Sequence, residues 1–398
     1  MSIITLFYGQ CGSQISEAFY NNLHTEICDS KKDDYYSQSV DSWFHVTKSN
    51  KLVPRSLLID TERKTKPRNV RYQLKNVVSK SCGGSANNWA FGYCEQSKLL
   101  TGEVEEQVRK ELERSNQQVR FLNIFSLSGG TGAGVGSAIN EFLKNEFPNK
   151  IINGVVLPYS SGELVTQSYN TLLALSKVYS TSDAIILFEN DRLHHTCTNS
   201  LNIKDVTFDD INNLIARQLL TVLQPLKDVQ TGDLLCNLCD DPLFKLLQIK
   251  LAPLSKLENA SNWRSLLTSI SRQSRYDFQQ KTQANVTLKL KGVSSALVCR
   301  GLYSPVETDF KPFKDSSVAK TVHIYHQRRK IFNLDNCLSV VSNSNNAFVS
   351  LYTILQDAWN LYKYGAYMHH YKKFGVDEAH FKSSFEIVEN VLQNYKHL

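Results

Sequence analysis

The sequence lacks any hydrophobic run long enough to cross a membrane. No apolar stretch approaches the roughly 18 residues that a spanning helix needs. The opening MSIITLFYGQCGSQ also lacks the basic start and the apolar core of a signal peptide. The nine cysteines are an odd number spread over 398 residues, which favours reduced thiols over a disulfide framework. We therefore expect a cytoplasmic protein without a membrane segment.

Acidic side chains are outnumbered by basic ones, and no Glu-rich tail closes the sequence. The formal net charge is +7 and the sequence pI is about 8.8. The basic residues are scattered, and their densest groups, at 326–330 and at Lys372 and Lys373, are short. Such scatter favours a solvated surface or contact with an acidic protein over nucleic acid. We expect no nucleic-acid partner.

Short apolar segments alternate with amphipathic ones over the first half of the chain, which is the pattern of a doubly wound α/β sheet. The strands that we expect are residues 2–8, 56–59, 121–127, 154–157 and 184–188. The helices that we expect are a segment with apolar side chains at every fourth residue from Ile15 to Ile27, residues 103–114 and residues 135–147.

The second half of the chain predicts further domains, because 398 residues exceed the usual size of one domain. A long helix is expected at 208–223, ending before Pro225. Beyond it the clearest strand pair is 286–290 with 295–299, and helices are expected at 347–364 and 377–395. The predicted units are a nucleotide-binding domain at 1–207, a core helix at 208–228, an intermediate domain at 229–345 and a helical domain at 346–398.

The most informative segment is Ser-Gly-Gly-Thr-Gly-Ala-Gly at residues 128–134, between an expected strand and an expected helix. Glycines let backbone N–H groups approach an anion closely, and the helix N-terminus adds a favourable dipole. Thr131 adds a hydroxyl donor. The segment therefore predicts a phosphate-binding loop.

Two other nucleotide motifs fit this loop poorly. No Lys-Ser or Lys-Thr follows the glycines, so the segment is not a P-loop. A G-x-G-x-x-G/A frame would end at Val135 or Ser137, so an NAD-type oxidoreductase is only a less favoured alternative. The pair Cys236 and Cys239 has metal-binding spacing, but no second pair follows it, and zinc is not favoured.

Residues 128–134 match the signature of the tubulin family at every position. Residues 9–14 resemble the loop after the first strand of that family, residues 86–92 its Asn-Asn-aromatic segment, and the region around Trp359 and Tyr371 its outer helices. The resemblance is weak between about 229 and 340. It implies a tubulin-like α/β fold: a doubly wound parallel sheet that binds nucleotide, an α+β intermediate domain and a C-terminal helical hairpin.

In tubulins these loops bind GTP or GDP, with Mg²⁺. The residues that the resemblance assigns to the nucleotide are Gly9, Gln10, Cys11, Gln14, Asn87, Ser126, Gly129, Gly130, Thr131, Gly132, Glu163, Phe208 and Asn212. Phe208 would stack on guanine, which is worth about 1–3 kcal/mol for a base on an aromatic ring, and Asn212 would read the base edge. Asp60 and Glu62 would face the Mg²⁺–phosphate region.

Some positions depart from the family pattern. Ser200 stands where many tubulins have an Asn that holds the base, and Gln167 stands where α- and β-tubulins have a Glu. The nucleotide site is therefore expected to be retained but altered. Hydrolysis in tubulins is completed across a subunit interface, and Asp233 aligns with the acid that acts on the neighbour's nucleotide. Any GTPase activity is thus expected to need a second subunit.

Several segments, among them 158–163, 189–191 and 371–376, resemble a specialised tubulin subfamily more than the α and β chains. That resemblance implies a cytoskeletal protein of centrioles and basal bodies, which forms or stabilises triplet microtubules. Its expected partners are other tubulins, contacted end to end, and centriolar or basal-body proteins. An assembly-coupled GTPase that forms its own polymer is the alternative, and the shortened intermediate region speaks against it.

Overall fold

A computed structural model gives the structure of most of the chain. It describes residues 1–28, 33–62, 72–80, 83–162, 164–227, 229, 231–255, 262–281, 290–306, 309–311, 313 and 319–398. Within these ranges, none of the helices is both long and apolar enough to cross a membrane.

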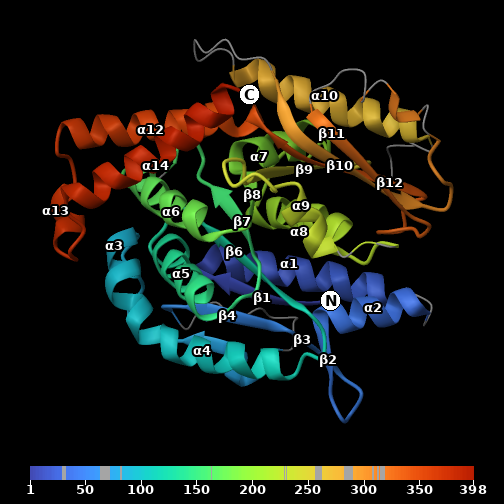
Figure 1. Ribbon diagram of the computed structural model, residues 1–398, viewed down its shortest axis with the longest axis horizontal. Coiled ribbons are helices and arrows are strands. Elements are labelled where there is room, and N and C mark those ends of the chain that lie inside the picture. Colours follow the sequence, from blue (N-terminus) through green and yellow to red (C-terminus); the bar gives the residue numbers. More distant parts are fainter. Residues whose placement is uncertain are drawn as a thin grey trace.

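Within the described residues, a ten-stranded sheet runs through the molecule in the order β11-β10-β12-β9-β8-β7-β6-β1-β4-β5 (Figure 1). Its strands are β1 (Ser2–Tyr8), β4 (Ser56–Asp60), β5 (Val77–Ser79), β6 (Val119–Ser126), β7 (Ile151–Leu157), β8 (Ala184–Glu189), β9 (Leu246–Ala252), β10 (Gly292–Gly301), β11 (Ala319–Gln327) and β12 (Asn336–Ser344). All strands from β9 to β5 in this order are parallel. β12 is antiparallel to both of its neighbours, and β11 is parallel to β10.

Helices cover both faces of the parallel strands (Figure 1). On one face the core is completed by α4 (Ser97–Glu113), α5 (Gly136–Glu146), α6 (Gln167–Thr181), α12 (Phe348–Lys363) and α14 (Glu378–Lys396). On the other face it is completed by α1 (Gly9–Cys28), α2 (Asp34–Trp43), α7 (Asn190–Asn199), α8 (Phe208–Leu223) and α9 (Thr231–Asn237). Coverage on both faces explains why β1, β7 and β8 are buried at every residue and mostly apolar, rather than alternating between apolar and polar residues.

Most elements expected in the first half and at the C-terminal end of the chain are confirmed. β1 and α8 have the expected limits, and the other expected strands lie within one to three residues of β4, β6, β7 and β8. The expected helix at 135–147 is α5, preceded by a π-helical turn at Thr131–Val135. The expected C-terminal helices are α12 and α14, with the short α13 (Met368–Lys372) between them. The predicted α/β tubulin-like fold class is confirmed.

The predicted strand pair in the intermediate region is the poorest match. Residues 286–289 lie outside the described residues, and Leu290 is not in a strand. Residues 295–299 do lie in β10, but β10 pairs with β11 and β12. Neither β9 nor α10 (Trp263–Lys281) was predicted. Through the pairing of β9 with β8, at Ile185↔Leu246 and Ile186↔Leu247, one sheet continues from the nucleotide-binding half into the intermediate region. The domain limits stay a prediction.

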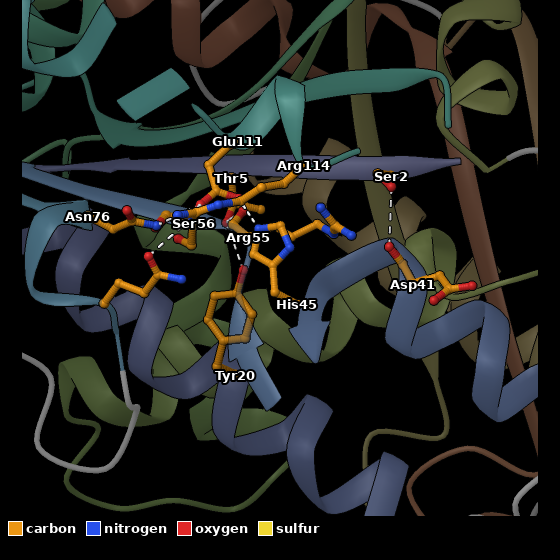
Figure 2. A network of polar contacts seen from close by, with 11 residues as sticks. Ser2, Thr5, Tyr20, Asp41, His45, Arg55, Ser56, Asn76, Glu111 and Arg114 are labelled. Carbon is orange, nitrogen blue, oxygen red and sulfur yellow. Dashed lines mark hydrogen bonds and ion pairs between the residues drawn. The ribbon is translucent and has the colours of Figure 1, made fainter. Parts of the chain in front are cut away.

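A buried carboxylate joins α4 to a small hairpin of β2 (Phe44–Val46) and β3 (Leu52–Pro54), as Figure 2 shows. The Glu111 side chain is fully buried; it contacts the His45 ring nitrogen and accepts hydrogen bonds from Asn76 Nδ2 at 3.1 Å and Arg114 Nη1 at 2.9 Å. Burial by itself would raise the pKa of Glu111, but the His45 and Asn76 hydrogen bonds and the Arg114 charge bring that pKa below its usual value. Glu111 therefore stays ionised in the folded protein.

Candidate functional site

The candidate site lies at the carboxyl edge of the parallel strands, where ligands bind in open α/β sheets. The residues after β1, β4 and β6 begin three of the loops that the sequence assigned to the nucleotide. These strands are neighbours in the order β6-β1-β4. Loops far apart in the sequence therefore meet at one place.

Close contacts between the loops explain why they need glycine. A Cβ atom on Gly130 would lie 2.4 Å from Ser85 O, and one on Gly132 would lie 2.8 Å from Ser126 O. Gly9 has a positive φ of 66°, and its Cβ would lie 3.3 Å from Gly132 N. The structure thus packs the loop after β1, the Asn-Asn loop and the 128–134 loop against one another, with no space for side chains.

A cluster of hydroxyl groups lines this junction. Thr131 Oγ1 lies 2.7 Å from Thr61 Oγ1 and 3.0 Å from Ser85 Oγ. Thr61 and Ser85 were missed by the sequence reasoning. Their only sequence signal is proximity to the predicted Asp60–Glu62 pair and to Asn87. Hydroxyl groups both donate and accept hydrogen bonds, so this cluster can bind anionic oxygens or water.

The Asn87 side chain lies across from Gly129 of the glycine loop. Its Oδ1 lies 3.8 Å from the position of a Cβ on Gly129. Ala86 and Asn87 both have φ of 50°, in the left-handed region that residues other than glycine rarely adopt. The backbone oxygens of Asn87 and Ser128 both accept hydrogen bonds from Asn170 Nδ2, each at 2.8 Å. Asn170 therefore ties the two loops together.

The predicted base-binding residues occupy the start of α8. Phe208 is 59% exposed although it is aromatic. Asn212, one turn later, is buried, and its Nδ2 has no hydrogen-bond partner among the residues described. An unpaired buried donor costs about 1–3 kcal/mol, so a ligand that accepts this hydrogen bond would relieve the cost. The capping box of Thr207 and Asp210 begins the helix at Phe208.

The first turn of α1 carries the remaining predicted contacts. Gln10 is exposed, and Cys11 and Gln14 are partly buried, directly after Gly9. Burial raises the pKa of the Cys11 thiol to about 12, so this thiol is neutral and contributes packing rather than charge. Ser126, the last residue of β6, has its Oγ 2.9 Å from Oγ of Ser128, the first residue of the glycine loop.

The predicted metal ligands lie beside the hydroxyl cluster. Asp60 is 8% exposed, and its Oδ1 accepts hydrogen bonds from Thr61 N at 2.8 Å and Glu62 N at 3.4 Å. Glu62 is exposed, with Oε1 2.6 Å from the position of a Cβ on Gly84. Over the described ranges, no group of three or more His, Cys, Asp or Glu side chains could hold a metal ion. Two carboxylates suit an ion that also takes phosphate oxygens and water, as Mg²⁺ does.

Asp233 lies away from these loops. It is on α9 and forms an ion pair with Arg120, which donates from Nη2 at 2.7 Å and from Nε at 3.3 Å to the same oxygen. Arg120 is near the start of β6, whereas the glycine loop follows its end. The six residue steps from Arg120 to Ser126 span roughly 20 Å along the strand. Asp233 therefore belongs to the amino edge of the sheet, opposite its own chain's candidate site.

The remaining predicted positions differ in what the structure describes. Glu163 lies outside the described residues. Ser200 follows α7 directly, and Gln167 begins α6, with Nε2 donating to Tyr159 O at 3.0 Å. Gln167 also borders a cavity of about 960 Å³ between α6, α7 and α12. Of the residues that the sequence assigned to the nucleotide and that the structure describes, none lines this cavity.

Comparison with known proteins identifies the class. Residues 2–198 match the model of the Tubulin/FtsZ family, GTPase domain, and the chain belongs to the tubulin family. A GTPase domain of this family binds GTP or GDP, which confirms the predicted kind of cofactor, whereas Mg²⁺ stays a prediction.

Individual relatives show which tubulin chains this protein resembles over its full length. The chain is 29% identical over 465 residues to the tubulin delta chain of Canis lupus familiaris, covering 100% of both proteins. It is 28% identical to the tubulin delta chain of Homo sapiens, again over 100% of both. A tubulin gamma chain of Caenorhabditis elegans is 28% identical over 244 residues, covering 56% of this chain and 54% of that protein. The chain is thus delta-tubulin-like along its whole length.

Proposed function

We propose that this chain is a guanine-nucleotide-binding structural subunit that contacts other tubulins end to end. The observation that carries the proposal is the base end of the site, where the orphaned Asn212 amide lies one turn from the exposed ring of Phe208. A guanine base stacked on Phe208 would offer an acceptor to Asn212 Nδ2. This pairing explains both a buried donor without a partner and an aromatic ring left in solvent.

Each part of the site has a distinct task in this proposal. Backbone N–H groups of residues 129–132 bind phosphate oxygens, and the cluster of Thr61, Ser85 and Thr131 orients oxygens beside them. Asp60 and Glu62 would hold Mg²⁺, which neutralises phosphate charge when bound. Asn87 faces the glycine loop at the γ-phosphate side, and Glu163 would meet the ribose.

The proposed role in cells rests on the likeness to tubulin delta chains. We assign the chain to the cytoplasmic cytoskeleton at centrioles and basal bodies, where it would form or stabilise triplet microtubules with centriolar proteins. Support comes from the match to delta chains over the full length, against a partial match to a gamma chain. Removing the chain from a ciliated cell should leave basal bodies with doublets or singlets. Intact triplets would contradict this role.

The proposal of guanine-nucleotide binding is tested by exchanging one side-chain atom of Asn212, the residue proposed to recognise the base. Asn212→Asp replaces the Nδ2 donor by an oxygen, so the affinity for GTP should fall by about tenfold or more. The matched control is Asn213→Asp, because Asn213 is the next residue of α8 and is exposed. Displacement of a fluorescent GDP analogue by GTP, GDP and ATP measures both variants. Equal affinities of the two variants, or a wild type that prefers ATP, would overturn the proposal.

A second candidate, an assembly-coupled GTPase, is favoured by one observation. Asp233 keeps 32% of its side chain exposed at the amino edge while Arg120 fixes it. In a head-to-tail stack this edge would face the nucleotide of the next subunit, where a carboxylate can accept a proton from water. Concentration-dependent pelleting with GTP distinguishes the two functions. A critical concentration for the chain alone supports the self-polymer, and its absence supports the structural subunit.

A further inference from the structure

The C-terminal hairpin makes direct contact with the loops of the candidate site. Tyr371, on α13, is fully buried and donates a hydrogen bond from its hydroxyl to Asn170 Oδ1 at 2.7 Å. Burial raises the pKa of Tyr371, so the hydroxyl keeps its proton and acts as the donor. The same Oδ1 accepts the backbone N–H of Trp89 at 2.9 Å. Asn170 is thereby held in the orientation that its other contacts require.

The other polar atom of the Asn170 side chain, Nδ2, contacts the predicted phosphate loops. Its Nδ2 donates to both Asn87 O and Ser128 O at 2.8 Å. One side chain thus receives a hydrogen bond from the C-terminal hairpin and bridges the Asn-Asn loop to the glycine loop. Because Asn170 is fully buried, water does not replace these partners when one is lost.

Two further contacts join α13 and the residues directly after it to the same loop. Asn88 Nδ2 donates to His370 O at 3.0 Å, and the rings of Phe91 and Phe374 stack with centroids 4.8 Å apart. In Figure 1 the short helices α3 (Trp89–Phe91) and α13 lie next to each other. The Asn-Asn loop is therefore held by contacts with the C-terminal hairpin and, separately, by the hydrogen bonds of Asn170.

The loop needs such support because its backbone is strained. Ala86 and Asn87 are consecutive residues with φ of 50° and neither is glycine. Left-handed conformations of such residues persist only where surrounding contacts impose them. The bonds to Asn87 O and from Asn88 Nδ2 lie immediately at this strained pair.

We propose that Tyr371 is a positioning residue for the γ-phosphate side of the nucleotide site, acting through Asn170 on Asn87, so that the C-terminal hairpin completes the site. The inference rests on the proposed guanine-nucleotide binding and deepens it. It predicts a selective effect: contacts to the terminal phosphate weaken when Tyr371 loses its hydroxyl, while contacts to the base and the inner phosphates remain.

The test compares two tyrosines that lose the same atom. Tyr371→Phe removes the hydrogen bond to Asn170. Tyr395→Phe is the matched control, because Tyr395 is equally buried and its hydroxyl donates to Asn343 Oδ1 and accepts from Leu246 N, each at 2.8 Å, away from the loops. Both full-length variants are measured by displacement of a fluorescent GDP analogue with GTP and with GDP, together with thermal unfolding.

Tyr371→Phe should lower the affinity for GTP by about tenfold and the affinity for GDP by less than about twofold. The tenfold loss is the size expected when a buried polar group loses one hydrogen-bond partner. Tyr395→Phe should lower the unfolding temperature without changing the ratio of the two affinities. An unchanged GTP-to-GDP ratio in Tyr371→Phe, or the same change in the control, would overturn the inference. A wild type that binds no guanine nucleotide would instead refute the proposed function.

Discussion

Replacing Phe208 by alanine tests whether the exposed ring serves a ligand rather than the core. Phe208 is the first residue of α8 and is 59% exposed. Its nearest aromatic neighbour is Tyr159, with ring centroids 6.4 Å apart and a tilted geometry. The neighbouring Tyr159 ring is tilted rather than stacked, so most of the Phe208 ring is left in solvent, where a base could stack on it.

The structure predicts different sizes for the two effects of this change. The fold hides less than half of the Phe208 surface, and the part lost on truncation, roughly 50 Å², is worth about 1 kcal/mol at 25 cal/mol per Å². Stacking of a base on an aromatic ring is worth about 1–3 kcal/mol, which corresponds to an affinity about 5- to 150-fold weaker. Phe208→Ala should therefore reduce nucleotide affinity strongly and lower the unfolding temperature by only about 2 °C.

The assay is nucleotide displacement combined with thermal unfolding of the same preparation. Tyr303→Ala is the control, because Tyr303 is 70% exposed and follows β10, far from the site in the sheet order. This control should keep wild-type affinity, and Phe208→Tyr should keep most of it. If Phe208→Ala binds GTP as tightly as wild type, the stacking role is wrong and Phe208 is merely an exposed aromatic residue.

Three further predictions concern other parts of the molecule. The pKa of Glu111 is lowered in the folded state, so its contribution to stability is present above the ordinary carboxyl pKa and is lost as the pH falls through the folded value. Glu111→Gln should therefore lower the free energy of unfolding by about 3 kcal/mol at pH 7 and weaken its dependence on pH below about pH 5. Urea unfolding measures both, and the same pH dependence in the variant as in the wild type would contradict this. Gly130→Ala places a Cβ 2.4 Å from Ser85 O and should weaken nucleotide binding at least about tenfold. The control Gly102→Ala lies in open space on α4, so this variant should bind nucleotide normally and gain up to about 1 kcal/mol of stability. Equal nucleotide affinities of the two variants would refute the close packing of the loops. Asp233→Asn should leave the nucleotide affinity of the isolated chain unchanged and slow turnover only in assemblies that contain it, so a change in affinity would contradict its position at the opposite edge.

The elements that local sequence signals determine could be predicted from the sequence. β1 reads SIITLFY and is buried along its whole length, so a short segment made mostly of apolar residues was a sufficient signal. α8 combines a buried stripe, a capping box at Thr207 and a stop before Pro225, and its limits were predicted correctly. The glycine loop at 128–134 was recognised because its backbone chemistry is written in consecutive residues.

Features that depend on distant partners could not be predicted in this way. The cluster of Thr61, Ser85 and Thr131 joins three separate segments and has no local pattern. Asn170 was not predicted as a site residue, although its side chain bridges two loops and accepts a hydrogen bond from the Tyr371 hydroxyl. The pairing of β10 was missed for the same reason, because its strand partners β11 and β12 are chosen by tertiary packing and not by adjacency.

Identification of the bound nucleotide tests the central claim most directly. The purified native chain would be denatured and the released small molecules separated by chromatography and identified by mass. Guanine recognition by Asn212 beside the Phe208 ring predicts GDP or GTP at about one molecule per chain, as expected for one preformed site. An empty chain, or one that carries an adenine nucleotide, would contradict the claim.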